Sequence, residues 1–205
     1  NLMPIAAQLA ISLENAYLYE HLRFLVDERT KALLEEIKVR KRAEEKLAHM
    51  ANYDALTGLP NRRLFHKLLS RLLLEAEASG QLLAVLYMDL DGFKTVNDQF
   101  GHGIGDKLLI EISRRLTAAV RSNEIIARIG GDEFLIALIA PVDMTASNVE
   151  QTAQRIIKAI NQPFYCENHK IQVGCSIGSA VFPGDSTEPQ TVIKYADKAL
   201  YYSKS

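Results

Sequence analysis

Two short acidic segments of the chain have the composition of a metal site. Gly130-Gly-Asp-Glu-Phe134 lies between two apolar runs, 125–129 and 134–139, that are predicted to be strands, so the glycine pair falls where a tight hairpin turn is needed. Asp89-Leu-Asp-Gly92 follows another apolar run, 82–88, and the pattern predicts a buried strand at 82–90 that ends in a turn. Carboxylates at the end of a buried strand are costly unless they are paired or bound to a cation. If the two segments lie side by side, their oxygens suit a hard divalent metal such as magnesium.

Each segment also has a plainer explanation. A Gly-Gly hairpin is common on structural grounds alone, and Asp89 and Asp91 are well placed to cap the short helix that follows them. The occurrence of both acidic segments in one chain favours the metal site over two unrelated turns.

The elements that must position these segments mix helices and strands without a strict βαβ alternation. Beyond the runs named above, the pattern predicts helices at 61–78, 104–121 and 145–160, strands near 164 and at 171–182, and a last helix from residue 188. This order indicates an α+β domain with a largely antiparallel sheet flanked by helices.

The first fifty residues predict a long helix with a coiled-coil seam. Apolar residues recur at an alternating spacing of three and four residues, and polar residues such as Arg23, Arg40 and Glu44 interrupt the series, so we expect a weak or register-changing coil. An ordinary amphipathic helix packed on its own domain is the alternative. The apolar seam residues are Leu2, Ile5, Leu9, Ala16, Tyr19, Val26, Leu33, Ile37, Leu47 and Ala51.

Composition limits the other functions open to this chain. With 205 residues and 48% hydrophobic content it is large enough for a real core, and a net charge of −1 gives no basic field for nucleic acid. The longest apolar run has about seven residues, too short for a membrane span. Cys166 and Cys175 lack metal-ligand spacing and indicate small core residues in a reducing cytoplasm. Because the chain starts at Asn1 within a helical pattern, we expect a fragment of a longer protein, one that could be membrane-associated as a whole.

Four motifs in order resemble the diguanylate cyclases, the GGDEF domains. They are Asp54-Ala-Leu-Thr-Gly-Leu-Pro-Asn61-Arg-Arg63, Asp89-Leu-Asp-Gly-Phe-Lys94-Thr-Val-Asn97-Asp98, Phe100-Gly-His102-Gly-Ile-Gly105-Asp106 and Gly130-Gly-Asp-Glu-Phe134. The resemblance runs from about Asn52 to Ser205, so we expect a coiled-coil segment at 1–51 and a catalytic domain at 52–205. The start of the chain, from Gln8 to Tyr19, is similar to the last helix of a GAF sensory domain. The family resemblance implies a ferredoxin-like palm of the nucleotidyl cyclase type.

The resemblance also implies a role for each matching residue. Asp89, Asp132 and the Leu90 carbonyl would hold Mg²⁺, or Mn²⁺ in its place, and Asp132 or Glu133 would help to deprotonate the attacking hydroxyl. A carboxylate already bound to a cation is a poor base, so the base role of Asp132 is the weaker inference. The GTP contacts implied are Lys94 and Lys204 on the phosphates, Asn97 and Asp106 on the guanine edge, and His102 beside them.

The family's product-inhibition site usually reads Arg-x-x-Asp, and this chain has Arg121-Ser-Asn-Glu124 there. Glutamate keeps the charge but moves it by one methylene, so feedback by cyclic di-GMP is expected to be weak. A further basic residue that relatives commonly carry after Lys204 is not in this sequence.

The resemblance therefore implies an enzyme that condenses two GTP molecules into cyclic di-GMP and two pyrophosphates. Each chain would bind one GTP, so two chains must face each other. We expect a homodimer through the N-terminal helix, in which a change of coil register could gate activity. Two alternatives remain: a catalytically silent module that binds GTP or cyclic di-GMP and regulates a neighbouring domain, and a simple coiled-coil dimerisation element. The intact Asp89, Asn97, Asp106 and Asp132 favour the enzyme.

Overall fold

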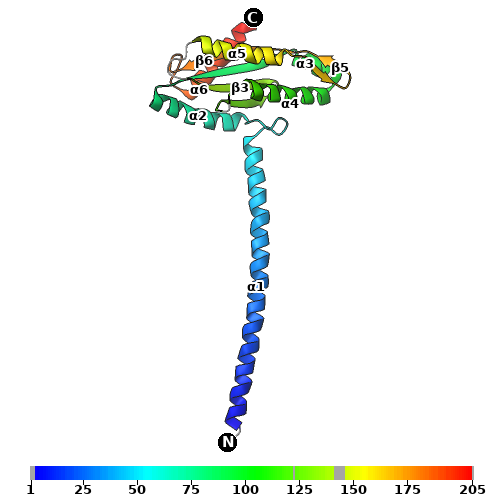
Figure 1. Cartoon of the computed structure of the whole chain (residues 1–205), viewed down its shortest axis with the longest axis vertical. Helices are drawn as coiled ribbons and strands as arrows, with labels where there is room; N and C mark the ends of the chain where they lie inside the picture. Colours follow the sequence, from blue (N-terminus) through cyan, green and yellow to red (C-terminus); the bar gives the residue numbers. More distant parts are fainter. Residues whose placement is uncertain (1–2, 122, 141–145, 205) are drawn as a thin grey trace. The chain divides into compact units, whose positions relative to one another are not determined.

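The computed structural model describes residues 3–121, 123–140 and 146–204, and their side chains from residue 11 onward except at 140, 146 and 147. The chain separates into two compact units, Asn1–His49 and Met50–Ser205. The first unit is formed by the long helix α1 (Met3–Asn52), whose last residues belong to the second unit. Every strand among the described residues lies in the second unit (Figure 1).

The second unit is built on an antiparallel sheet with the strand order β2-β3-β1-β6. Its strands are β1 (Leu82–Asp91), β2 (Ile125–Gly130), β3 (Glu133–Ala140) and β6 (Gly174–Phe182). A separate two-stranded hairpin joins β4 (Phe164–Cys166) to β5 (His169–Ile171). The continuous apolar sequence of β1 is explained by its place between β3 and β6, since a central strand covered on both faces needs apolar residues on both.

Helices cover both faces of this sheet. Side chains at even positions of β1, such as Leu86 and Met88, belong to the core shared with α3 (Phe93–Phe100), α4 (His102–Ala119) and α5 (Ala146–Ile160). Those at odd positions, such as Val85 and Tyr87, belong to the core shared with α2 (Arg62–Ser79) and α6 (Pro189–Ser203). Alternation along β1 therefore decides to which face each acidic residue at its end belongs.

The observed elements confirm the α+β class with an antiparallel sheet and a long N-terminal helix. Three boundaries differ from expectation. Strand β1 continues to Asp91, one residue beyond the predicted end at residue 90, so Asp89 and Asp91 lie in the strand. Helix α4 begins at His102, and the strand expected at 171–182 is divided into β5 and β6. The start of the helix expected at Thr145 lies outside the described residues.

Helix α2 begins where local chemistry requires it. The Asn61 side chain accepts a hydrogen bond from the Leu64 amide at 3.0 Å, which caps the helix, and donates to the Ala51 carbonyl at 3.0 Å. An N-cap of this kind satisfies one of the amides that a helix leaves unpaired at its start.

The apolar side chains of α1 lie exposed in the single chain. Val26 is 55%, Leu33 43% and Ile37 59% exposed, all three at seam positions. Leu2, Ile5 and Leu9 lie outside the residues whose side chains are described. Over the described ranges, α1 included, we find no helix with the length and hydrophobicity needed to cross a bilayer.

Candidate functional site

The register of β1 against β3 brings the two acidic segments together. Asp89 pairs directly with Glu133, and Met88 pairs with Phe134. Asp89 follows Tyr87 on the face of the sheet covered by α2 and α6, because alternate residues of a strand share a face. Glu133 precedes Leu135 on that same face. The family motifs predicted that Asp89 and Glu133 would lie near a metal. No feature of the sequence predicted that they would pair directly across β1 and β3.

Asp132 lies close enough to Asp89 for the two charges to interact. Burial raises the pKa of Asp132, and the negative charge of Asp89 raises it further, although Lys204 and Arg128 partly compensate. A carboxylate whose ionised form is disfavoured by burial and by a neighbouring negative charge is in an environment that a bound divalent cation would relieve.

Lys204 reaches this site from the end of α6. Its Nζ donates to Oδ1 of Asp89 in an ion pair between residues 115 positions apart in the chain. The approach of α6 to the sheet depends on Gly178 of β6, because a Cβ there would lie 2.0 Å from the Leu200 amide nitrogen and 2.2 Å from the Ala196 carbonyl oxygen. Sequence reasoning predicted that Lys204 would bind phosphates, and the structure also pairs it with a predicted metal ligand.

Arg128 connects the Gly-Gly hairpin to the loop after α1, a role that the sequence analysis missed. Its guanidinium donates to the Asp54 carboxylate at 3.0 and 3.2 Å and to the Gly131 carbonyl at 3.0 and 2.8 Å. Burial works against ionisation of Asp54, but hydrogen bonds from Thr57 and Arg128 outweigh it and hold the pKa of that carboxyl below its ordinary value. A signal was present, since Asp54 opens the first family motif, but nothing local indicates its partner 74 residues away.

The residues expected to recognise guanine lie around the junction of α3 and α4. Asn97 of α3 lies against Gly105 of α4 so closely that a Cβ on Gly105 would be 1.9 Å from the Asn97 Oδ1. Asp106 is the next residue and is exposed, as are His102 at the start of α4 and Lys94 at the start of α3. Asn97 and Asp106 are thus close in space, on consecutive helices.

The donor set fits a divalent metal held by two carboxylates. Asp89 and Asp132 interact electrostatically, and the Leu90 carbonyl belongs to the residue next to Asp89. Among the described residues no group of three or more His, Cys, Asp and Glu side chains is arranged to hold a metal ion. A site with fewer carboxylates, completed by a backbone carbonyl and by substrate phosphates, is the usual form for Mg²⁺.

The predicted inhibitory residues lie in the loop after α4. The Glu124 carboxylate accepts a hydrogen bond from the Arg121 backbone amide at 2.6 Å, and the Glu124 amide donates to the Arg121 carbonyl at 3.0 Å. Both the side chain and the backbone of Glu124 are therefore hydrogen-bonded to the backbone of Arg121.

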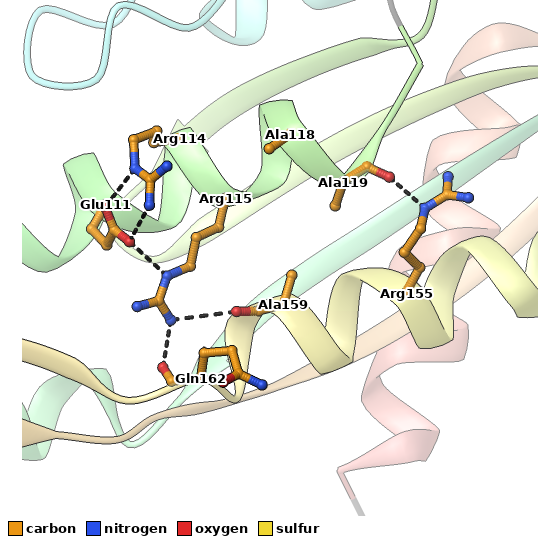
Figure 2. Close-up of a pocket in the computed structure, with 8 residues that line it drawn as sticks. All are labelled: Glu111, Arg114, Arg115, Ala118, Ala119, Arg155, Ala159 and Gln162. Carbon is orange, nitrogen blue, oxygen red and sulfur yellow. Dashed lines mark hydrogen bonds and ion pairs between the residues drawn. The ribbon is translucent and has the colours of Figure 1, made fainter.

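A hollow of about 490 Å³ lies between α4 and α5 beside this loop (Figure 2). Three arginines line it, and Arg155 donates to the Ala119 carbonyl at 2.6 Å, two residues before Arg121. The other lining residues are Glu111, Arg114, Arg115, Ala118, Ala159 and Gln162.

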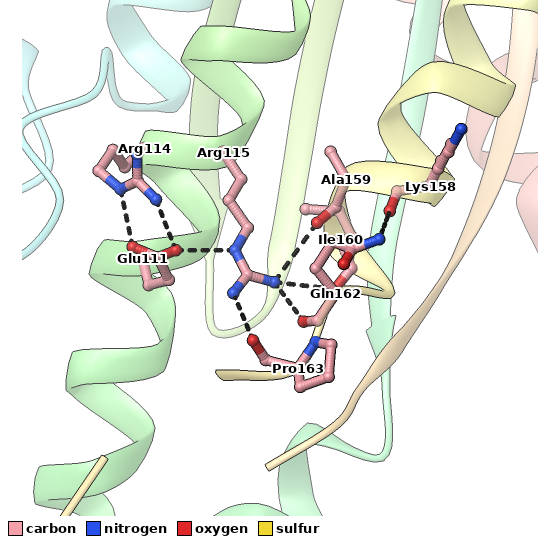
Figure 3. A network of polar contacts seen from close by, with 8 residues as sticks. All are labelled: Glu111, Arg114, Arg115, Lys158, Ala159, Ile160, Gln162 and Pro163. Atoms are coloured by element: carbon pink, nitrogen blue, oxygen red, sulfur yellow. Dashed lines mark hydrogen bonds and ion pairs between the residues drawn. The ribbon is translucent and has the colours of Figure 1, made fainter. Parts of the chain in front are cut away.

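The arginine network in this hollow has a clear structural role (Figure 3). Arg115 donates to Glu111 at 2.8 Å and to carbonyls at the end of α5, including Ala159 and Ile160 at 3.3 Å. Arg114 forms two hydrogen bonds with Glu111, and these with Arg115 lower the pKa of Glu111 to about 2. Arginine near a helix C-terminus satisfies carbonyls that have no partner within the helix.

The structure is an α+β domain with an antiparallel sheet, in which a carboxylate at the end of the central strand faces one beside a Gly-Gly hairpin. This combination is that of the GGDEF class of domain. The family model described as "Diguanylate cyclase, GGDEF domain" matches residues 51–205, and the chain belongs to this family.

Three known proteins illustrate the likeness. The bifunctional diguanylate cyclase/cyclic di-GMP phosphodiesterase MucR of Pseudomonas aeruginosa is 41% identical over 80% of this chain and 23% of its own length. A sensory box/GGDEF family protein of Caulobacter crescentus is 40% identical, with a TM-score of 0.71 over 75% of this chain and 97% of that structure. The coiled coil and GGDEF domain of DgcB from Caulobacter crescentus, solved with c-di-GMP, is 28% identical, with a TM-score of 0.76 over 87% of this chain and 94% of that structure.

Proposed function

We propose that this chain is a diguanylate cyclase that condenses two GTP molecules into cyclic di-GMP and releases two pyrophosphates. The observation that supports this most directly is the meeting of Asp89, Asp132 and Glu133 at the adjoining ends of β1 and β3. A structural turn has no need of three neighbouring carboxylates, and one of them, Asp132, lies where burial and the charge of Asp89 disfavour its ionised form.

Asp89, Asp132 and the Leu90 carbonyl would hold the divalent metal, Mg²⁺ or Mn²⁺. When bound, the metal would neutralise GTP phosphates and polarise the α-phosphorus. Glu133 lies opposite Asp89 and would share with Asp132 the removal of the proton from the attacking 3′-hydroxyl. Since a metal-bound carboxylate is a poor base, Glu133 is the better suited of the two if it stays unligated.

Lys94 and Lys204 would neutralise the β- and γ-phosphates. In the structure Lys204 is paired with Asp89, so substrate binding would exchange the carboxylate for a phosphate as the partner of this ammonium. Asn97 and Asp106 would select guanine, because an amide and a carboxylate together match its O6 acceptor and its N1 and N2 donors. His102 lies exposed beside them.

Two chains must face each other, because one bound GTP supplies the hydroxyl that attacks the other. The exposed apolar seam of α1 supports a parallel homodimer, which would raise the effective concentration of the second domain. A change in coil register would alter how the two domains meet and so gate activity. The chain spans less than a quarter of MucR. A sensory or phosphodiesterase domain in the whole protein is therefore part of this proposal.

The ion pair of Lys204 with Asp89 favours a second candidate function. A carboxylate occupied by an internal ammonium is less available to a metal, as expected for a silent module that binds GTP or cyclic di-GMP and regulates a neighbouring domain. The two candidates differ in whether bound nucleotide is converted.

The deciding experiment incubates the purified chain with GTP and Mg²⁺, or Mn²⁺, and separates the products by chromatography. Asp132→Ala should abolish cyclic di-GMP formation, since loss of a metal ligand costs several kcal/mol of transition-state stabilisation. Asp27→Ala, an exposed aspartate of α1 outside the family motifs, is the matched control and should stay active. Nucleotide binding without product would identify the silent module, and full activity of Asp132→Ala would refute the assigned metal site.

A further inference from the structure

The β4–β5 hairpin lies against the segment that carries the proposed guanine contacts. The ring of His169 on β5 is 4.9 Å from the ring of Phe100, the last residue of α3, with the two planes tilted by 48°. Glu167, in the hairpin turn, forms an ion pair with Lys107 of α4. Figure 1 shows β5 at the same end of the domain as α3.

These two contacts bracket residues 101–106. Phe100 immediately precedes Gly101 and His102, and Lys107 immediately follows Asp106. One small element thus holds the guanine segment on both sides, although it follows that segment by about sixty residues, as the separation of Lys107 and Glu167 shows.

The backbone geometry of the hairpin supports both of these contacts. Glu167 and Asn168 both have positive φ, 49° and 66°, which is the backbone of a tight two-residue turn matching the twist of its strands. Such a turn sets the backbone positions from which the Glu167 and His169 side chains extend. Ile171, also on β5, is buried in the core that residues of α3, α4 and α5 share, which anchors the hairpin to the domain.

We propose that the β4–β5 hairpin is a positioning element for guanine, acting through Glu167 on Lys107 and His169 on Phe100. Neither residue touches the base. They hold the 101–106 segment so that Asp106 meets the N1 and N2 donors while Asn97 is fixed against Gly105. The inference rests on the proposed GTP function and deepens it, because it identifies what sets the preference for guanine.

Binding of two unreactive analogues to the full chain tests this. The α,β-methylene analogues of GTP and ATP share their phosphates and differ only in the base, so calorimetric titration with Mg²⁺ separates base recognition from phosphate binding. Glu167→Ala or Lys107→Ala should weaken the GTP analogue by about two- to fivefold, the range for an exposed ion pair. His169→Ala should weaken it by about two- to tenfold, and the ATP analogue should bind as it does to the parent.

Two rescues and one control distinguish positioning from a general effect on the fold. The exchanged pair Lys107→Glu with Glu167→Lys should return to within about twofold of the parent, since the ion pair is restored in reverse. His169→Phe should keep the ring contact and the affinity. Lys170→Ala is the control, because Lys170 points to the other face of β5 from His169.

The proposal is overturned if Glu167→Ala and His169→Ala bind the GTP analogue with the affinity of the parent. It is likewise overturned if these variants lose affinity for both analogues equally, or if the exchanged pair does not regain affinity for the GTP analogue. It is also overturned, together with the guanine site, if the parent does not bind the GTP analogue. A parent that shows the expected binding pattern but makes no cyclic di-GMP would refute the cyclase proposal alone.

Discussion

Replacing Arg128 by alanine should loosen the Gly130–Gly131 hairpin and destabilise the domain. Arg128 is 12% and Asp54 23% exposed at the side chain, so their pair lies between an exposed ion pair, worth up to about 1 kcal/mol, and a buried one, whose disruption costs about 3–5 kcal/mol. We take about 2 kcal/mol for the pair and about 1 kcal/mol for the bonds to the Gly131 carbonyl. A loss of about 3 kcal/mol should lower the unfolding temperature of a domain of this size by about 6–12 °C.

The loss should depend on pH in a direction fixed by Asp54. Its pKa is lowered in the folded state, so the stability that its ionised form contributes is present above the ordinary pKa of an aspartate and is lost as the pH falls through the lowered value. Without Arg128 the pKa of Asp54 should move back up. The difference in unfolding free energy between parent and Arg128→Ala should therefore have its largest value at neutral pH and become smaller as the pH is lowered.

Thermal unfolding followed by circular dichroism at a series of values from about pH 7 down to about pH 2.5, well below the ordinary aspartate pKa, measures both effects. Initial rates of cyclic di-GMP formation should fall as well, because Gly131 adjoins Asp132. Arg63→Ala, an exposed arginine of α2, is the matched control and should unfold like the parent. An unfolding temperature unchanged in Arg128→Ala, or a difference that does not narrow in acid, would contradict this account.

Four further outcomes are expected. Asp106→Asn should weaken GTP use far more than stability, because an amide leaves one of the guanine donors unmatched, and equal turnover of GTP and ATP by the parent would exclude base selection. Removing residues 1–49 should lower activity per chain at low protein concentration, and a dilution series with unchanged specific activity would show that the helix is dispensable. Gly178→Ala should destabilise the domain by about 1–3 kcal/mol in urea titration, because its Cβ would meet the backbone of α6 at 2.0 Å, and an unchanged midpoint would disprove that close approach. Added cyclic di-GMP should inhibit the parent weakly, lose its effect in Arg121→Ala and gain effect in Glu124→Asp, whereas a parent insensitive to product would mean that Glu124 has disabled the site.

The sequence by itself determined the parts of this protein that depend on local chemistry and spacing. The apolar run 82–88 predicted the central strand, because a strand covered on both faces needs uninterrupted apolar residues. The Gly-Gly pair predicted the hairpin, and Gly130 and Gly131 indeed take positive φ there. Four motifs in order predicted the family that the match over residues 51–205 confirms. The site roles stay predictions that the geometry supports.

Only the tertiary structure decided which side chains meet. The opposition of Asp89 and Glu133 depends on strand register, and a slip of one residue would move Glu133 to the other face of the sheet. The pairs of Arg128 with Asp54 and Lys204 with Asp89 join residues far apart in the chain, so no local pattern encodes them. The β4–β5 hairpin likewise contacts Phe100 and Lys107 through residues about sixty positions later in the chain, and the burial of Ile171 in the shared core holds it there. Spacing in a sequence indicates which groups are available, whereas the folding of the backbone over long distances decides their partners.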